Sequence, residues 1–180
     1  MTQTSEIAVA RPAAGEYAPY YEKYVGRVPD GEVVEALERQ GGEAAAFFRG
    51  IPADLHEHRY APEKWSIKEV VGHIADAERI FAYRLLRIGR GDAVALPGFD
   101  ENAYVPAGEF GARTLESLVD ELESVRRATL TLARGFPADA WARVGTASEN
   151  PVSARALAYI LWGHLDHHLE ILRTRYLGAS

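Results

Sequence analysis

The sequence predicts an all-α domain built as a four-helix bundle. Four long segments repeat apolar residues at helical spacing, capping residues bound them, and no segment shows convincing strand alternation. At 180 residues, with 47% hydrophobic and 26% charged residues, the chain can bury one continuous core. We therefore expect a single bundle domain over residues 29–180. An extended arm rich in proline, glycine, alanine and tyrosine is expected over residues 1–28.

The first two helices are predicted from their ends. The first follows Pro29-Asp30 and runs from about 33 to 48, because glycine and proline follow at 50 and 52. The second begins at Ser66, where Ser66-Ile67-Lys68-Glu69 fits a capping box, and ends at Gly89 and Gly91. Its apolar residues repeat at helical spacing, so one face should be buried.

The last two helices are predicted in the same way. The third runs from Thr114 to Gly135, and the fourth is capped by Ser153 and ends before Gly178. Residues 92–113 lie between the second and third helices, with two prolines and three glycines. A connection of this length is typical of a crossover or a functional loop.

Composition excludes several classes of protein. A net charge of −6 and the absence of a basic patch argue against nucleic acid as a partner. The longest apolar run, 156–162, is too short to span a membrane, and no secretory leader pattern precedes the domain. We expect a soluble cytoplasmic protein. Because the chain has no cysteine, any thiol chemistry needs an external thiol.

Three histidines are candidate metal ligands. His164 and His168, in LWGHLDHHLEIL, lie one turn apart on the apolar stripe of the fourth helix. Such a pair alone is often only core filling, but His73 of the second helix also faces inward. Each buried imidazole costs about 1–3 kcal/mol if a ring nitrogen is unpaired. One shared ion would satisfy all three rings.

The position of each histidine along its helix constrains the topology. His73 lies roughly 10 Å from the start of the second helix, and His168 roughly 12 Å from the end of the fourth. These levels match if the two helices are antiparallel. An up-down-down-up bundle makes them antiparallel and needs a long crossover between helices two and three. Residues 92–113 are long enough for that crossover.

The segments EKWSIKEVVGHIADAE, LPGFDENAY and GHLDHHLEIL together resemble the DinB-like superfamily of metal-binding bundles, which includes YfiT-type proteins. The likeness covers about residues 30–177. It implies an up-down-down-up bundle with a divalent metal held by one histidine of helix two and an H-x-x-x-H pair of helix four. These positions are His73, His164 and His168 here. Some relatives use mycothiol or bacillithiol as a co-substrate.

Three protein ligands would leave an open coordination position, as in catalytic sites. We expect one divalent transition metal ion, with Zn, Ni and Fe as candidates for imidazole ligands. The first functional hypothesis is a metal-dependent enzyme, a small-thiol S-transferase or a hydrolase, acting on a small molecule. The alternative is a non-catalytic metallo-bundle whose ion is structural or senses stress. A closed site with a fourth protein ligand would favour the alternative.

Four further polar residues are candidates for the pocket or for supporting a ligand. Glu78 lies on the apolar side of helix two and is expected either to orient a ligand histidine or to pair with an arginine. His167, on the flank of the stripe, is a candidate for the rim or for a surface position. Asp76 and Arg84 flank His73 and could line the pocket or form a solvated ion pair.

Assembly as a homodimer is expected because members of the resembled family often pair. The interface is expected to involve the bundle helices or the arm, which carries four tyrosines: Tyr17, Tyr20, Tyr21 and Tyr24.

Overall fold

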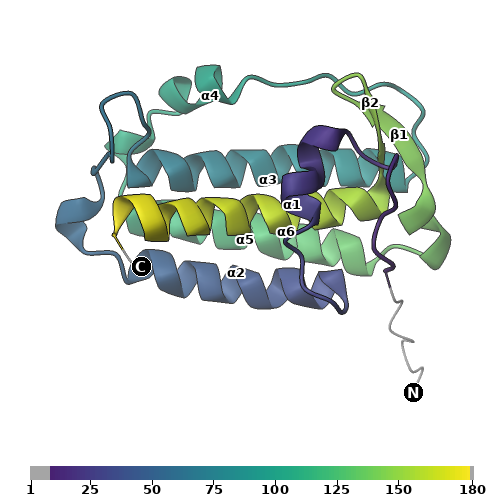
Figure 1. Cartoon of the computed structure of the whole chain (residues 1–180), viewed down its shortest axis with the longest axis horizontal. Helices are drawn as coiled ribbons and strands as arrows, with labels where there is room; N and C mark the ends of the chain where they lie inside the picture. Colours follow the sequence, from purple (N-terminus) through teal and green to yellow (C-terminus); the bar gives the residue numbers. More distant parts are fainter. Residues whose placement is uncertain (1–8, 179–180) are drawn as a thin grey trace.

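The computed structural model describes residues 9–178 and confirms the four-helix bundle (Figure 1). Its long helices are α2 (Val33–Arg49), α3 (Ile67–Gly89), α5 (Leu115–Arg134) and α6 (Ala154–Ile171). Around the bundle, α2 packs against α5, α5 against α3, α3 against α6 and α6 against α2. The capping box expected at the start of α3 is present, since Ser66 and Glu69 each accept the other's backbone N–H.

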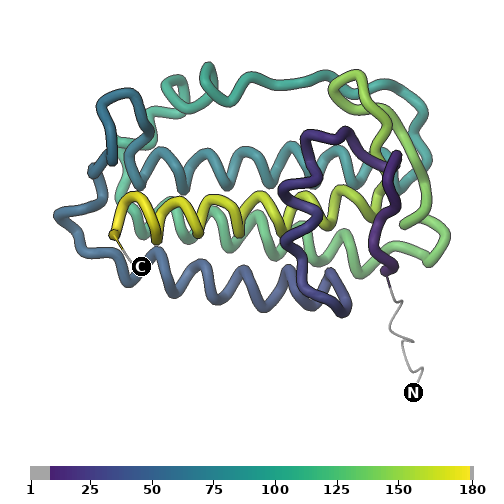
Figure 2. The backbone as a smooth tube through the Cα atoms, viewed as in Figure 1, coloured from purple at the N-terminus to yellow at the C-terminus, as the bar shows by residue number. Residues whose placement is uncertain are grey.

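The directions of the helices follow from contacts between their ends. Arg49 at the end of α2 bonds Glu116 and Asp120 at the start of α5, so these two helices are antiparallel. The Tyr176 hydroxyl, just beyond α6, donates to the Trp65 carbonyl just before α3, so these helices are also antiparallel. The tube in Figure 2 shows α3 and α5 running in one direction and α2 and α6 in the other. The order of directions is therefore up, down, down, up.

The crossover between α3 and α5 is more ordered than the sequence indicated. It contains the short helix α4 (Glu101–Ala107), which begins where the Asp100 carboxylate accepts the Asn102 N–H at 2.9 Å. The expectation of no strand is wrong for residues 144–153. There β1 (Val144–Ala147) and β2 (Asn150–Ser153) form an antiparallel hairpin directly before α6. Leu96 of the crossover pairs with Ala147, which ties the crossover to the hairpin.

The N-terminal arm is partly helical rather than extended. Residues 9–28 include a 3₁₀ turn, Pro19–Tyr21, and the short helix α1 (Glu22–Val25), which packs across α6. The expectation for residues 1–8 lies outside the described part. A Cβ atom added to Gly163 of α6 would lie 2.1 Å from the Tyr24 carbonyl oxygen. Glycine at this position therefore lets the arm touch the backbone of α6.

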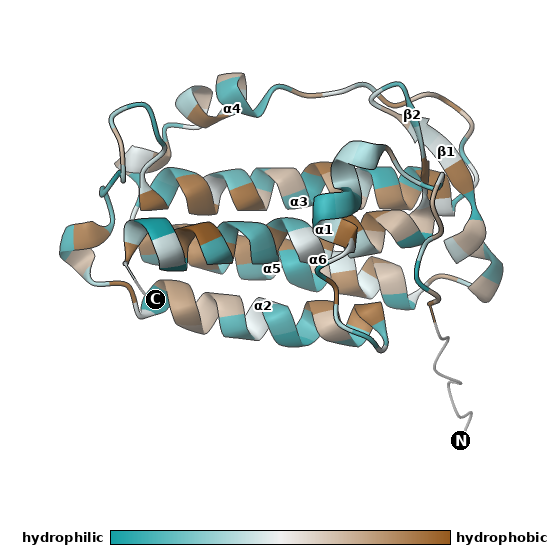
Figure 3. Ribbon diagram, viewed as in Figure 1, coloured by the Kyte–Doolittle hydropathy of each residue, from teal (hydrophilic) through white to brown (hydrophobic). Residues whose placement is uncertain are grey.

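The core fills the space between the four long helices. Each helix carries hydrophobic residues on part of its surface and hydrophilic residues on the rest (Figure 3). Within residues 9–178, no helix is long and apolar enough to cross a membrane. Among the largest fully buried side chains are Leu37 and Phe48 of α2, Ile74 and Leu85 of α3, Leu118 of α5, and Leu157, Ile160 and Leu165 of α6.

Candidate metal centre

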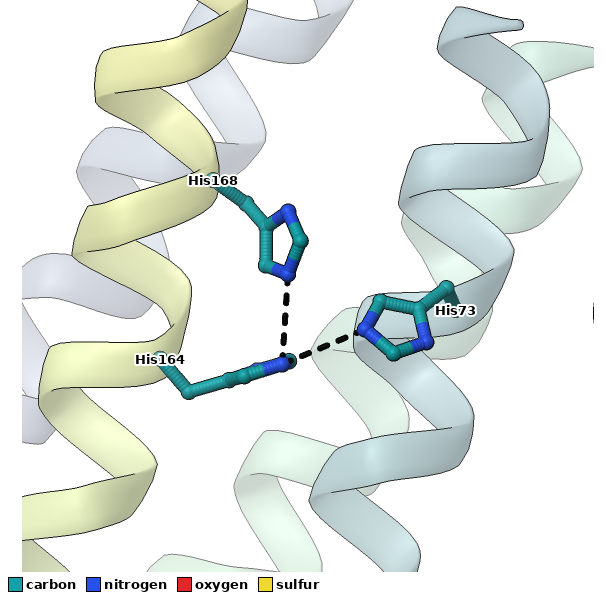
Figure 4. A group of neighbouring side chains, drawn as sticks. All are labelled: His73, His164 and His168. Carbon is teal, nitrogen blue, oxygen red and sulfur yellow. Dashed lines mark hydrogen bonds between the residues drawn. The ribbon is translucent and has the colours of Figure 1, made fainter. Parts of the chain in front are cut away.

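Three imidazoles converge between α3 and α6. His73 comes from α3, and His164 and His168 come from successive turns of α6, so their rings face one another (Figure 4). The Nε2 atom of His164 lies 3.2 Å from Nε2 of His73 and 3.2 Å from Nε2 of His168. One ligand atom from each ring lies within 4.8 Å of the other two. The antiparallel pairing of α3 and α6 brings the three histidines to this common level.

Burial keeps these imidazoles neutral. The pKa of His73 falls to about 4 because burial penalises the charged ring. The pKa values of His164 and His168 lie well below the usual range, first through burial and then through the neighbouring imidazoles. At neutral pH each ring therefore has a free nitrogen lone pair, which is the form that binds metals.

Hydrogen bonding alone does not explain the arrangement. A single ring nitrogen carries either one proton or one lone pair, so Nε2 of His164 cannot make good hydrogen bonds to both neighbouring nitrogens. In a tetrahedral site with metal–nitrogen bonds of 2.0–2.1 Å, the ligand nitrogens lie about 3.3 Å apart. The observed spacing of 3.2 Å fits this geometry. The cluster could therefore hold one divalent ion.

The cluster contains no fourth ligand within residues 9–178, since no Asp, Glu, Cys or further His joins the three histidines. It opens instead into a pocket of about 510 Å³. The rings of Trp65, Phe81 and Tyr24 lie 4.7, 5.7 and 5.6 Å from the nearest ligand ring, measured between centroids. The N-terminal arm, the segment before α3, α3 itself, the crossover, the hairpin turn and α6 all line the pocket. The lining residues are Tyr20, Tyr21, Lys23, Tyr24, Trp65, His73, Phe81, Phe99, Glu101, Ser148, His164, His167 and His168.

Glu78 pairs with an arginine. Within the described residues it forms no hydrogen bond to a ligand histidine. Its two carboxylate oxygens accept from Nε and Nη2 of Arg126 on α5, at 2.6 and 2.8 Å. Arg126 also donates to the Leu37 carbonyl at 2.8 Å, so the pair joins α2, α3 and α5. Of the two roles expected for Glu78, the structure shows pairing with an arginine.

The three remaining candidate residues, His167, Asp76 and Arg84, lie in different surroundings. His167 lines the pocket, with its ring 5.5 Å from that of Tyr24. Asp76 does not line the pocket and faces Arg79 at 3.5 Å, as an ion pair on its own helix. Arg84 neither lines the pocket nor forms a solvated ion pair; it is buried, and its Nη2 atom donates to the Pro97 carbonyl and the Ser148 hydroxyl, both at 2.9 Å.

Sequence reasoning missed several residues that line the pocket. Lys23 and Ser148 reach it because the arm and the hairpin fold back over the bundle, and no local pattern in the sequence indicates that placement. Glu101 had a weak signal, because DEN at 100–102 offers an N-cap followed by an acidic first turn.

Topology and site together define a class, the helical bundle with a histidine cluster that could hold a metal ion. The chain belongs to the DinB superfamily, whose family profile matches residues 36–172. No curated protein matches the sequence. Among solved structures the fold is similar to that of YfiT from Bacillus subtilis, with a TM-score of 0.74 and 15% identity over 85% of this chain and 91% of that one. YfiT is described as a probable metal-dependent hydrolase with an unusual four-helix bundle topology.

Proposed function

We propose that this protein is a metal-dependent enzyme that holds one divalent ion through His73, His164 and His168. The observation that carries the proposal is the open geometry of the cluster. Three imidazoles, with two Nε2–Nε2 distances of 3.2 Å and all ligand nitrogens within 4.8 Å of one another, lie beside a pocket of about 510 Å³, and no fourth protein ligand joins them among the described residues. Three ligands with an open position are typical of catalytic sites, whereas structural sites are closed by four.

The bound ion would supply Lewis acidity, which lowers the pKa of a coordinated water or thiol. The chain's own residues hold the neutral imidazoles in place. Trp65, Phe81 and Tyr24 surround the cluster with aromatic rings. Imidazole ligands suit Zn, Ni or Fe.

Two reactions fit this site. Hydrolysis of a small substrate is favoured by the likeness to YfiT, which is described as a probable metal-dependent hydrolase. Transfer of a small thiol to an electrophile would need a thiol co-substrate, because the chain contains no cysteine. The proposal includes a cytoplasmic location, a small-molecule substrate and no nucleic-acid partner. The homodimer stays a prediction from the sequence.

Metal content tests the ligand assignment. Protein purified without a metal-affinity step should carry one divalent ion per chain by elemental analysis. Replacing His164 by Ala should remove it, because the Nε2 atom of His164 lies between the other two. His56→Ala is the matched control, since the His56 ring bonds the Ile51 carbonyl outside the cluster. Full metal retention in the His164 variant would overturn the assignment.

Activity and stability then separate an enzyme from a structural metallo-bundle. Chelation should abolish turnover in a screen of esters, amides and thiol–electrophile pairs, and added metal should restore it. The competing role has its own support, because an ion at this cluster would cross-link α3 and α6. If no substrate shows metal-dependent turnover while metal removal strongly lowers the melting temperature, the structural role is correct.

A further inference from the structure

Arg84 is a buried cation near the pocket wall. It lies three turns beyond His73 on α3, and only 2% of its surface is exposed. Its guanidinium carbon lies 5.9 Å from the centroid of the Phe81 ring and 5.8 Å from that of Phe99. The acceptors within hydrogen-bond distance, the Pro97 carbonyl and the Ser148 hydroxyl, are both neutral.

Arg84 differs in this respect from Arg126, the other buried arginine. Arg126 is 4% exposed and its charge is balanced by both oxygens of Glu78. Within residues 9–178, no carboxylate lies within ion-pair distance of Arg84. Burying a charge without a counter-ion costs several kcal/mol, so such a group usually has a partner. The missing partner of Arg84 points to an anionic ligand.

The Arg84 guanidinium has donors that its two hydrogen bonds do not use. Both hydrogen bonds come from Nη2, which leaves Nε and Nη1 without a partner among the described residues. Arg84 itself is not among the residues that line the pocket of the ligand histidines, but three of its neighbours line that pocket, namely Phe81, Phe99 and Ser148.

Two hydroxyl groups lie beside the guanidinium. Ser148 sits in the hairpin turn with φ at +50°, and Glu149 follows with φ at +64°. Positive φ at both central residues is typical of a two-residue hairpin turn. Tyr21 also lines the pocket, with its ring centroid 6.3 Å from that of Phe81, and the nearby Arg84 guanidinium partly offsets the rise in the Tyr21 pKa caused by burial. Both hydroxyls can donate to an oxyanion.

We propose that Arg84, with the hydroxyls of Ser148 and Tyr21, binds the oxyanion group of the substrate, a carboxylate or a phosphate. The body of the substrate then lies along Phe81, whose ring contacts both the guanidinium and the His164 ring. The substrate is therefore a small organic anion whose opposite end reaches the histidine cluster. The reaction at that end rests on the proposed function, whereas binding of the anion rests on Arg84 alone.

Calorimetry with three probes that share a phenyl ring and differ in the head group tests this specificity. Benzoate, phenylphosphonate and benzamide are titrated into the full-length, metal-loaded protein. We expect one or both oxyanions to bind at least about tenfold more tightly than neutral benzamide, and the stronger of the two identifies the head group. Arg84→Met should remove this preference, Arg84→Lys should retain part of it, and Ser148→Ala should weaken it.

Arg90→Met is the matched control, because it removes an exposed arginine from the end of the same helix and should leave binding unchanged. Thermal unfolding of each variant shows whether it is folded; if Arg84→Met does not fold, Arg84→Lys and Ser148→Ala decide. Equal affinity for benzoate, phenylphosphonate and benzamide would overturn the proposal. So would unchanged oxyanion binding in the Arg84 variants, or no oxyanion binding at about 10 mM.

Repeating the titrations with metal-free protein separates this proposal from the proposed function. Oxyanion binding that needs Arg84 and persists without metal supports the Arg84 site, even if no metal-dependent reaction is found. Oxyanion binding that needs the metal and not Arg84 places the anion on the ion, which overturns the Arg84 site and leaves the metal centre intact.

Discussion

The Glu78–Arg126 pair shows how strongly the interior depends on individual charged residues. Both residues are almost fully buried, at 3% exposure for Glu78 and 4% for Arg126, and their bidentate contact joins α3 to α5. Removing one partner leaves an uncompensated charge, so Arg126→Met should lower the free energy of unfolding by about 3–5 kcal/mol. Replacing both residues together, as Glu78→Leu with Arg126→Met, should lower the free energy of unfolding by less than Arg126→Met alone. Urea titration measures both changes.

Metal content in the same variants separates a structural role of Glu78 from a role in orienting a ligand. Because Glu78 contacts Arg126 and has no hydrogen bond to a histidine among the described residues, the folded double variant should keep its metal. Arg79→Met, which breaks an exposed ion pair with Glu121, is the matched control and should cost less than about 1 kcal/mol. Loss of metal in the stable double variant would return Glu78 to the ligand-orienting role.

The three candidate ligands could be predicted because their signal is local. His164 and His168 share a helical stripe, and His73 repeats with the apolar residues of its own helix, so periodicity alone turns all three inward. The unpaired charge of Arg84 has no such signal. It depends on which carboxylates approach from distant segments, and helix periodicity contains no information about that.

Among the elements, those defined by side-chain chemistry at their ends were predicted best. Thr114 and Ser153 accept backbone N–H groups at the starts of α5 and α6, as expected from the sequence. The hairpin was missed because its turn residues, Ser148 and Glu149, take positive φ values without glycine, and because Pro151 lies in a strand of four residues. Its fold depends on packing against α3, where Gly145 lies against Ile88.

The contact between the N-terminal arm and α6 leads to a prediction about these two elements. In Gly163→Ala the new methyl group would overlap the Tyr24 carbonyl, so α1 must shift away from α6. We expect a loss of about 1–3 kcal/mol in the free energy of unfolding and faster tryptic cleavage after Lys23 and Arg27. Gly42→Ala is the control, because Gly42 is exposed on α2 and a Cβ atom added there meets nothing within 4 Å. This substitution should leave the free energy of unfolding unchanged or raise it by up to about 1 kcal/mol. Equal proteolysis of the two variants would contradict this account of the contact.

For the whole molecule, the topology is what assembles the site. In an up-down-up-down bundle, α3 and α6 would be parallel, and His73 near the start of one helix would lie far from His168 near the end of the other. The long crossover through α4 reverses this relation and also contributes Phe99 and Glu101 to the pocket. The cost of the arrangement is two buried imidazoles and one half-buried imidazole, whose effect on stability depends on pH.

Metal-free protein should therefore lose stability in mild acid. An unfolded histidine takes up a proton below about pH 6.5, whereas folded His73 does so only near pH 4, because burial disfavours its charged form. Between these values the unfolded state binds more protons, so the free energy of unfolding falls as the pH drops from about 6.5 to about 4. For His73 alone the full loss is about 3 kcal/mol. The pKa values of His164 and His168, lowered mainly by burial, add a loss of the same sign.

Urea unfolding of chelated protein at several pH values between 7.5 and 4 measures this slope. The variant His73→Asn lacks one titrating ring, whereas the carboxylates of the protein titrate as in the parent. The free energy of unfolding of this variant should therefore fall less steeply with decreasing pH, and the difference in slope should approach the contribution of one histidine. His58→Asn, outside the cluster and packed against Tyr176, controls for the loss of a histidine as such. With metal present, protons and the ion compete for the same ring nitrogens, so the metal-induced rise in melting temperature should shrink over the same range of pH. Identical slopes for the parent and the His73 variant would show that burial of the histidine cluster does not control the acid sensitivity of the fold.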